Sequence, residues 1–597
     1  MEQKWRQSRD REGAVAAILT APSRSRLCLE YGYVRVARFG IMKLILLVLV
    51  AGVSHAQITM NAPPNKNMRT PLANVVYASQ IPGVVLDANL DGASGQTCTD
   101  NSDRLNAVLR AATTLHPVDL VMDGPSCIGN TGGQMCLDIR GLSNVTIEGI
   151  GWGSGFFLKA GANCAAISNI TLYGNGKPPA RTASNIQIRN LRISGNADQV
   201  CEGGVCFGIK IFDADNVVVD DVYITNVKYF ATGFGNVSNV TVTNNTMLQG
   251  PGTGGDPIHF TGPFSNIFIA NNKLQAGDDC IALNLPEAYG GNGSNVLIAN
   301  NQMVGDGCSD FMRIYNNVGG GANPTYRITG VVVDGVIGKV TCTANPAVFY
   351  FGEASGGGAF AEANTLKASH IDVDGSSNCM LAQMRGTWGS VDFSDWILRN
   401  PKANTPAIQY FADVTNSTIT GGVIERYAAG QATSWPIQVG AATVKNLQLS
   451  NIVVTDPSGS NFNAAPQLLD IVAGTVSQVT LGTPFNGNGK ISNLYSNGSA
   501  ARVTSIAGAD NFVAVPATSC GTASGNNTAG AIAASSSLSG CTLTFGGRAQ
   551  SAGWTCSASN WTHPASALVQ TGGSGATAVL TGTISNGDAL SYQCRAY

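Results

Sequence analysis

The chain is poor in charged side chains. Asp, Glu, Lys and Arg make up only 12% of its 597 residues, whereas an ordinary soluble domain has about 25%. Two adjacent aspartates, Asp278 and Asp279, are therefore unexpected in this sequence and are candidates for a functional site. The sequence also has no paired CxxC and no HExxH spacing, so nothing in it indicates a zinc site.

The chain also lacks an excess of positive charge. Nine of its 35 basic and four of its 37 acidic residues lie before Gln57, which leaves 26 and 33 in the remainder, a net charge of −7. A surface of this sign argues against nucleic-acid binding. It also offers no broad basic groove for a polyanion, which argues mildly against a strongly charged substrate.

No apolar run near the amino terminus is long enough to cross a bilayer comfortably. Residues 42–56 instead have the pattern of a signal peptide, with Lys43, the apolar run 44–50 and a small-residue cleavage site at 54–56. Residues 1–41 contain eight Lys or Arg and resemble an upstream start-codon extension. If they are instead a long basic n-region, the prediction of export is unchanged. We expect a secreted or periplasmic protein that begins at Gln57.

Cysteine usage agrees with export. Fourteen of the 15 cysteines follow the predicted cleavage point, and an even number suits disulfides in an oxidising compartment. Closely spaced cysteines, Cys127 with Cys136 and Cys201 with Cys206, are candidates for pairs that staple loops. The full pairing does not follow from the sequence.

A short motif, Ser or Asp followed by Asn and two apolar residues in alternation, recurs through the middle of the chain. Its asparagines are separated by 41, 31, 23, 27 and 29 residues. They are Asn144, Asn185, Asn216, Asn239, Asn266 and Asn295. Short β-branched strands at such a period indicate an all-β, right-handed parallel β-helix. Asparagine at a repeated corner tolerates left-handed backbone and can bond the Asn of the next coil. A β-sandwich or propeller is the alternative.

The domain boundaries follow from changes in composition. We expect an N-terminal segment at 57–83, the β-helix at 84–496 and a linker at 497–507. Apolar spacing predicts an amphipathic helix near 101–115, capped by Asp100 or Ser102, that closes the first coil. This beginning resembles β-helices of the pectate-lyase superfamily. Residues 508–597 predict a small disulfide-containing β-sandwich, whose Trp554, Trp561 and Tyr592 are either core residues or a sugar-stacking platform.

Four aspartates lie on successive units of the repeat. Asp256 precedes Asp278 by 22 residues, and Asp279 precedes Asp306 by 27. If these segments stack as coils, their carboxyl groups lie in one patch. Hydrolysis of a glycosidic bond with inversion needs a protonated and an ionised carboxyl about 6.5–9.5 Å apart. Side chains one coil apart start about 4.8 Å apart and can splay to that range. Crowding also keeps one carboxyl protonated near neutral pH.

The segments 256–259 (Asp-Pro-Ile-His), 277–282 (Gly-Asp-Asp-Cys-Ile-Ala) and 305–307 (Gly-Asp-Gly) resemble the active-site motifs of the polygalacturonase family of inverting glycoside hydrolases. That family carries Asn-Thr-Asp, Gly-Asp-Asp-Cys, Gly-His-Gly and Arg-Ile-Lys in this order. The resemblance covers about residues 84–400 and implies that Asp278 is the general acid. It implies that Asp256 and Asp279 position and deprotonate the attacking water.

The resemblance also suggests a substrate-binding group, His259, Asp306 and Arg313, with two departures from the family pattern. Asp306 stands in place of the family's His, and Arg-Ile-Tyr at 313–315 stands in place of Arg-Ile-Lys. A neutral or differently charged glycan is therefore an alternative to a uronate.

Other functions also fit the sequence. The acidic cluster could be a non-catalytic stack or a Ca²⁺ site. A polysaccharide lyase would use Ca²⁺ with Arg313 as the only nearby candidate base, whereas a hydrolase would need no cofactor. A β-helix followed by a β-rich domain also suits a glycan-binding, adhesin-like protein, which resembles phage tailspikes in layout.

Overall fold

The computed structural model describes residues 74–596, apart from short gaps, of which the longest are 171–177, 353–362, 426–435, 456–466, 483–492, 496–501, 508–516 and 546–553. The predicted extension at 1–41, the signal peptide at 42–56 and residues 57–73 of the N-terminal segment lie outside the described residues.

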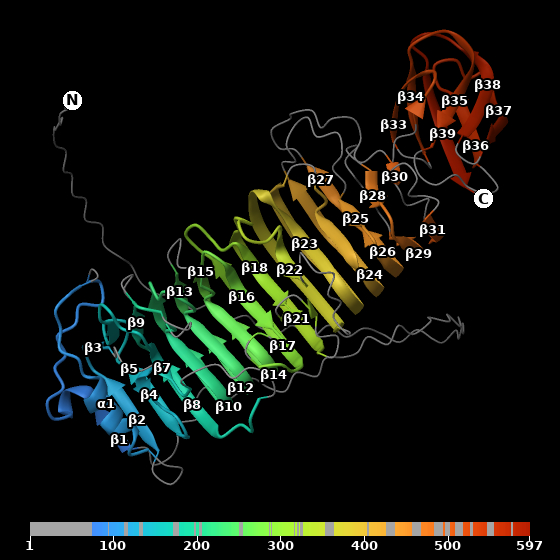
Figure 1. The fold of residues 1–597 in the computed structure, drawn as a ribbon. Coiled ribbons are helices and arrows are strands. Elements are labelled where there is room, and N and C mark those ends of the chain that lie inside the picture. Colours follow the sequence, from blue (N-terminus) through green and yellow to red (C-terminus); the bar gives the residue numbers. More distant parts are fainter. Residues whose placement is uncertain are drawn as a thin grey trace, which may run out of the picture. The chain divides into compact units, whose positions relative to one another are not determined.

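The prediction of a parallel β-helix is confirmed (Figure 1). Twenty-nine strands form one sheet, in which strands pair in parallel with strands of neighbouring coils. Val240, for example, lies between Val217 and Ile267. All three are fully buried, and one continuous apolar core runs through the stack. A coil buries its apolar face only against its neighbours, so the coils are stable as a stack.

The first coils contain β1 (Asn74–Tyr77), β2 (Val118–Met122), β3 (Pro125–Ile128), β4 (Met135–Asp138), β5 (Val145–Gly149), β6 (Gly155–Leu158), β7 (Ala165–Ser168), β8 (Ala183–Arg189) and β9 (Arg192–Ser194). The central coils contain β10 (Ile209–Asp220), β11 (Tyr223–Thr225), β12 (Thr232–Thr243), β13 (Thr246–Leu248), β14 (Ile258–Ala270), β15 (Lys273–Gln275), β16 (Asp279–Asn284), β17 (Gly293–Met303), β18 (Asp310–Tyr315), β21 (Ile328–Lys339) and β22 (Ala347–Phe351). A separate two-stranded hairpin contains β19 (Asn317–Val318) and β20 (Gly321–Ala322).

The last coils contain β23 (Ala363–Pro401), β24 (Ile408–Glu425), β25 (Ile437–Val439), β26 (Thr443–Ser450), β27 (Val453–Thr455), β28 (Gln467–Ile471), β29 (Thr475–Leu481), β30 (Asn493–Tyr495) and β31 (Val503–Ala507). Strand β31 pairs with β29, so the stack extends into the segment 497–507 that we expected to be a linker. It also begins earlier than predicted, because β1 pairs with β2.

The recurring asparagines form the expected ladder. All six have positive φ, between 54° and 58°. The side-chain amide of each of four of them donates to the carboxamide oxygen of the preceding one, at 2.8–3.2 Å, and the pairs are Asn185 to Asn144, Asn216 to Asn185, Asn266 to Asn239 and Asn295 to Asn266. A second ladder, which we did not predict, lies in the interior, where Asn245, Asn272 and Asn301 are buried and hydrogen-bonded in series. These ladders satisfy polar groups at the same corner of each coil.

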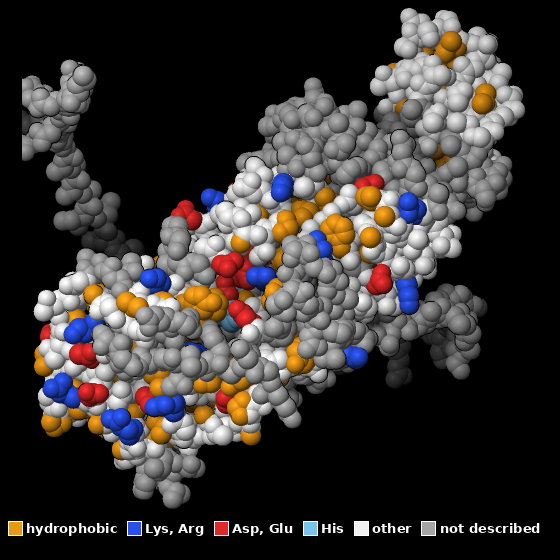
Figure 2. Space-filling view, viewed as in Figure 1, with side chains coloured by type: hydrophobic (Ala, Val, Ile, Leu, Met, Phe, Trp, Pro, Cys, Tyr) orange, Lys and Arg blue, Asp and Glu red, His pale blue; other side chains and the backbone are white. Residues whose placement is uncertain are grey.

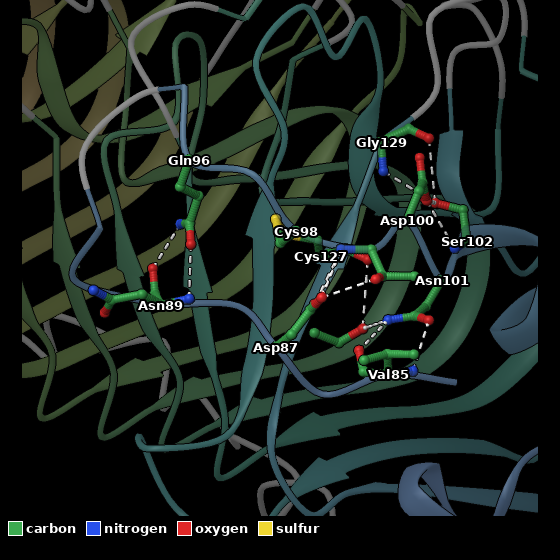
Figure 3. The surroundings of a disulfide bond; sticks show 12 residues. Val85, Asp87, Asn89, Gln96, Cys98, Asp100, Asn101, Ser102, Cys127 and Gly129 are labelled. Carbon is green, nitrogen blue, oxygen red and sulfur yellow. Dashed lines mark hydrogen bonds between the residues drawn. A yellow bond between two sulfur atoms is a disulfide. The ribbon is translucent and has the colours of Figure 1, made fainter. Parts of the chain in front are cut away.

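Helix α1 (Ser102–Leu109) packs its buried Leu105 and Leu109 against the apolar core at the first coils. It ends earlier than the predicted 101–115. Its N-cap residue is Asn101 and not the predicted Asp100 or Ser102, although the Asp100 carboxylate accepts hydrogen bonds of 2.9 and 2.7 Å from the backbone N–H and hydroxyl of Ser102 in the first turn. Figure 3 shows this region beside the Cys98–Cys127 disulfide, where the Asn101 side chain hydrogen-bonds Val85 and Ser126.

All fourteen cysteines after Cys28 are paired in seven disulfides. The predicted Cys201–Cys206 pair is confirmed, and the predicted Cys127–Cys136 pair is wrong. Cys127 pairs with Cys98 and Cys136 with Cys164, at separations of 29 and 28 residues. Each of these bonds therefore joins positions about one coil apart, because in a solenoid the neighbour in space is the residue one repeat away.

A separate eight-stranded antiparallel unit forms the carboxyl-terminal domain. Its strands are β32 (Ala517–Thr518), β33 (Gly521–Gly525), β34 (Ala529–Ala534), β35 (Leu538–Thr544), β36 (Trp554–Asn560), β37 (Ala567–Ser574), β38 (Thr577–Ile584) and β39 (Ala589–Ala596). Trp554 and Tyr592 belong to its core, whereas the Trp561 side chain is exposed. The three aromatic residues therefore do not form one platform. Among the described residues, no helix has the length and apolarity needed to cross a membrane.

Candidate active site

Three consecutive coils bring the predicted acidic residues together through β14, β16 and β18. Ile258 pairs with Ile281, which places Asp256 level with Asp279, and Asp279 pairs with Asp310 on the following coil. Side chains alternate between core and exterior along a strand. In Figure 2, a group of Asp and Glu side chains, with a Lys or Arg side chain beside it, lies on one face of the β-helix.

The carboxyl groups of Asp256, Asp278 and Asp279 meet, with one oxygen from each lying within 4.8 Å of the others. Asp256 and Asp279 are buried, whereas Asp278 is partly exposed. The backbone N–H of Asp279 donates a hydrogen bond of 3.2 Å to Asp256 Oδ1. Asp278 therefore presents the surface of the cluster, and the other two lie behind it.

Asp310, which the sequence analysis missed, adds a fourth carboxyl. It is fully buried and hydrogen-bonds Asp279, and the Asn345 amide donates to Asp310 at 2.6 Å and to Asp279 at 3.1 Å. Burial raises the pKa of Asp310 to about 7, although its bonds to Asp279 and Asn345 act in the opposite direction. Burial and the charge of Asp310 hold the pKa of Asp279 well above its usual range. The two carboxyls therefore share a proton near neutral pH.

His259 links two acidic residues. Its Nδ1 lies 2.7 Å from Asp256 Oδ2, and its Nε2 lies 2.7 Å from Glu287 Oε2. The ring stacks on Phe230 with 4.0 Å between centroids. Burial alone would lower the pKa of His259, but Glu287 and Asp256 outweigh this effect and raise it to about 10. His259 is therefore an imidazolium at neutral pH.

The same contacts tune the two acidic partners of His259. Burial raises the pKa of Asp256 to about 6 against the opposing effect of His259. Burial would also raise the pKa of Glu287, but His259 and the amide of Asn284, 2.6 Å away, lower it to about 2. At neutral pH Glu287 and most of Asp256 are ionised, so the site contains ionised and protonated carboxyls side by side.

Arg313 supplies the second cation. Its guanidinium lies 3.6 Å from Asp279 Oδ2 and over the ring of Tyr315, 4.4 Å from the centroid. Arg313 occupies the position of His259 two coils further on, because both pair with Ala282. Of the residues suggested for substrate binding, the structure thus brings His259 and Arg313 to the cluster.

Asp306 is outside the cluster, which corrects the sequence-based grouping. It lies in an exposed turn four residues before Asp310, the first residue of β18. A step of 27 residues from Asp279 leads to Asp306. This coil is longer, however, because 31 residues separate Asp279 from its strand partner Asp310. The pattern of Asp, two apolar residues, any residue and an apolar residue recurs at 279–283 and 310–314, and this pattern could have revealed Asp310. Glu287 and Asn345 lie in loops, and no repeat indicates them.

Three of these carboxylates, Asp256, Asp278 and Asp279, are close enough to hold one cation. Oxygen ligands of this kind suit Ca²⁺. The cluster already has Arg313 and the His259 imidazolium as neighbours. Protons and these two cations therefore offset much of the negative charge.

No protein-family profile matches the sequence, and no curated protein does. Similar solved structures include the tailspike protein gp49 of Pseudomonas phage LKA1, with 13% identity and a TM-score of 0.51 over 87% of this chain and 100% of that chain. A tailspike variant of E. coli bacteriophage HK620 in complex with a pentasaccharide has 11% identity, a TM-score of 0.44 and coverage of 84% and 90%.

The A-module of the mannuronan C-5 epimerase AlgE6 of Azotobacter vinelandii has 13% identity, a TM-score of 0.34 and coverage of 74% and 99%. The TM-scores of the latter two are below 0.5, and only the likeness to gp49 supports the fold. At 13% identity the likeness to gp49 shows the fold, a parallel β-helix, and does not show the activity.

Proposed function

We propose that the protein is an exported glycoside hydrolase that cleaves a polysaccharide at the Asp256–Asp278–Asp279 cluster. One observation carries the proposal: three carboxyl groups from two successive coils, with oxygens within 4.8 Å, meet at a partly exposed point of the β-helix face. A site that must both give and take a proton needs carboxyls in different protonation states, and this cluster contains them.

Asp278 is the carboxyl that reaches the surface, and we assign it the protonation of the leaving glycosidic oxygen. Asp256, whose pKa is raised to about 6, is largely ionised at neutral pH and accepts the proton of the attacking water. Asp279, which shares a proton with Asp310, holds that water. His259 keeps Asp256 in place through the 2.7 Å contact. The products are two shorter glycans, one with a new reducing end.

The spacing of the carboxyls bears on the stereochemistry. Their nearest oxygens lie closer than the separation of about 6.5–9.5 Å that is typical of inverting pairs. The family resemblance favours inversion, and we retain it as part of the proposal. The anomeric configuration of the first product, measured by proton NMR within the first turnovers, decides between inversion and retention.

The experiment is release of reducing ends by the chain from Gln57, on pectic and neutral polysaccharides, with and without a chelator. Asp278→Asn keeps the shape and removes the acid, whereas Asp306→Asn, in an exposed turn outside the cluster, is the matched control. We expect chelator-resistant release that Asp278→Asn lowers by at least about 100-fold. Equal activity of Asp278→Asn and the parent chain would refute the assignment.

The close approach of the three carboxylates favours a second candidate, a Ca²⁺-dependent lyase with Arg313 near the reacting sugar. A lyase leaves a double bond that absorbs in the ultraviolet and requires the cation. Absorbance that appears with Ca²⁺ and disappears with chelator would select this candidate over hydrolysis.

A further inference from the structure

The column of side chains that contains His259 and Arg313 continues beyond the acidic cluster. From Arg313 the strand register leads to Tyr350, Gln383, Gln409, Gln438 and Asp470, one residue per coil. Their neighbours along the strand, such as Ile408 and Tyr410 beside Gln409, are buried in the core. Alternation therefore directs the column to the same exterior face as the candidate active site.

The three glutamines form a ladder of carboxamides. The Nε2 amide of Gln383 donates to Gln409 at 2.7 Å, Gln409 donates to Gln438 at 2.5 Å, and Gln438 donates to the carboxylate of Asp470 at 2.8 Å. All donors point in one direction, so the ladder fixes the orientation of every amide. A carboxamide has two N–H donors and two acceptor lone pairs, and each rung therefore keeps further donor and acceptor capacity.

The end of the ladder that faces Arg313 has unused hydrogen-bonding capacity. Gln383 is 6% exposed, and within the described part of the chain its Oε1 has no hydrogen-bond partner. The same is true of the Nε atoms of Arg313 and Arg385. Buried polar atoms without partners are uncommon and call for an explanation. Here Gln383 and Arg385 lie two residues apart on β23, and Arg313 lies two coils before Gln383 in the same column.

An aromatic residue lies beside the ladder. Phe411 is 36% exposed and pairs with Arg385, whose guanidinium lies 4.7 Å from the ring centroid. Gly440 lies under the ring, where a side chain would collide with it. Phe411 is thus held in one position, two residues from Gln409. An apolar ring next to fixed amides provides both kinds of contact that a sugar makes, through its C–H groups and its hydroxyls.

We propose that this face, the glutamine column of Gln383, Gln409 and Gln438 with Arg385 and Phe411, binds a single neutral glycan chain that extends from the acidic cluster along the β-helix. Rungs repeat every ~4.8 Å, which is comparable with the length of one pyranose residue in an extended chain. Between Arg313 and Asp470 the column itself carries no charge, and the cation beside it, Arg385, faces the ring of Phe411. The carboxamides of the column suit the hydroxyl groups of neutral sugars. This inference rests on the proposed function for the location of cleavage, but binding does not require cleavage.

Binding is measured by calorimetry in the Asp278→Asn background, so that a protein without hydrolase activity is still tested. The probes are trisaccharides and octasaccharides of the gluco, galacto, manno and xylo series, with oligogalacturonides of the same lengths. The variants are Gln409→Leu and Phe411→Ala. Gln448→Leu, an exposed glutamine of β26 outside the column, is the matched control.

We expect at least one neutral octasaccharide to bind more tightly than its trisaccharide. Gln409→Leu and Phe411→Ala should each weaken octasaccharide binding about 5- to 10-fold, with less than about a twofold effect on the trisaccharide and none from Gln448→Leu. Thermal unfolding of each variant identifies loss of folding. Phe411→Ala changes an exposed side chain and is therefore expected to disturb folding less than Gln409→Leu. If no probe binds, or short and long probes lose affinity equally, the proposal is overturned and the ladder is structural only.

Discussion

The backbone N–H of Asp279 donates a hydrogen bond to the Asp256 carboxylate, at 3.2 Å, from the next coil of the β-helix. The stack itself therefore orients the carboxylate, because the donor belongs to a strand whose register is fixed by its neighbours. A backbone donor cannot rotate away as a side chain can. Asp256 is then held on its other oxygen by His259.

Replacing His259 tests this arrangement. In His259→Gln the imidazolium between Asp256 and Glu287 is lost, so we expect the pKa of Asp256 to rise further above 6. The acidic limb of the pH–rate profile should move up by about one pH unit. His370→Gln, which changes an exposed histidine on another part of the β-helix, is the control. An unchanged acidic limb would show that Asp256 does not set it.

The effect of His259→Gln on stability should depend on pH, and its direction follows from the pKa of His259. The folded pKa of His259, about 10, exceeds its usual value of 6.5. Its contribution is therefore complete below about pH 6.5 and is lost as the pH rises through 10. We expect His259→Gln to destabilise the protein most at pH 6 and least above pH 10, as measured by urea unfolding. A loss of stability that is independent of pH would indicate a packing role against Phe230 instead.

Asp310→Asn should have a pH dependence of the same sign as His259→Gln, because the folded pKa values of both residues are raised. A carboxyl whose folded pKa is raised, here to about 7, favours folding below about pH 4, and this contribution is lost as the pH rises through 7. The change in the free energy of unfolding caused by Asp310→Asn should therefore be more favourable at pH 8 than at pH 4, by on the order of 2–4 kcal/mol. Urea unfolding at both pH values measures this, with Asp306→Asn as the exposed control.

The Cys280–Cys308 disulfide joins the coil of Asp279 to that of Asp310 across 28 residues. Replacing both cysteines with alanine should lower the free energy of unfolding by about 2–4 kcal/mol. Activity should also fall, because both bonded residues lie within two positions of an acidic side chain of the site. Replacing Cys201 and Cys206 should lower the free energy of unfolding less, since their disulfide closes a loop of five residues and a shorter loop constrains the unfolded chain less. Equal losses would show that loop closure does not determine the effect.

Asn266 tests the corner ladder. It has a φ of 56° and donates to Asn239 at 3.0 Å. Asn266→Gly removes the side-chain bonds and also the Cβ, whereas Asn266→Ala removes the same bonds but keeps a Cβ in left-handed backbone. We therefore expect alanine to be less stable than glycine by about 1–2 kcal/mol, which denaturant unfolding resolves. Alanine as stable as glycine would mean that the corner relaxes.

The sequence predicted those features of the fold that repeat. Asparagine corners such as Asn239 and Asn266 recur at a recognisable step, and this step predicts the parallel β-helix. Asp256 precedes the paired aspartates at 278–279 by about one such step, so three carboxyls of the site follow from the sequence as well. The coil that holds Asp310 is longer, and a fixed step therefore led to Asp306 instead.

Residues that reach the site from loops, such as Glu287 and Asn345, have no repeat to reveal them. The protonation states of these groups could not be predicted from the sequence either. They depend on burial and on distances such as the 2.7 Å between His259 and Glu287, which emerge only from the folded coils.

The asparagine steps of 41, 31, 23, 27 and 29 residues differ widely, yet asparagines separated by 41, 31, 27 and 29 residues hydrogen-bond to one another in register. Extra residues in a coil are therefore absorbed outside the strands and do not propagate along the stack. Insertions can reshape the walls around the carboxyls while the carboxyls keep their mutual positions. In such a protein, substrate preference and catalytic geometry can evolve separately, because length variation acts on one and strand register preserves the other.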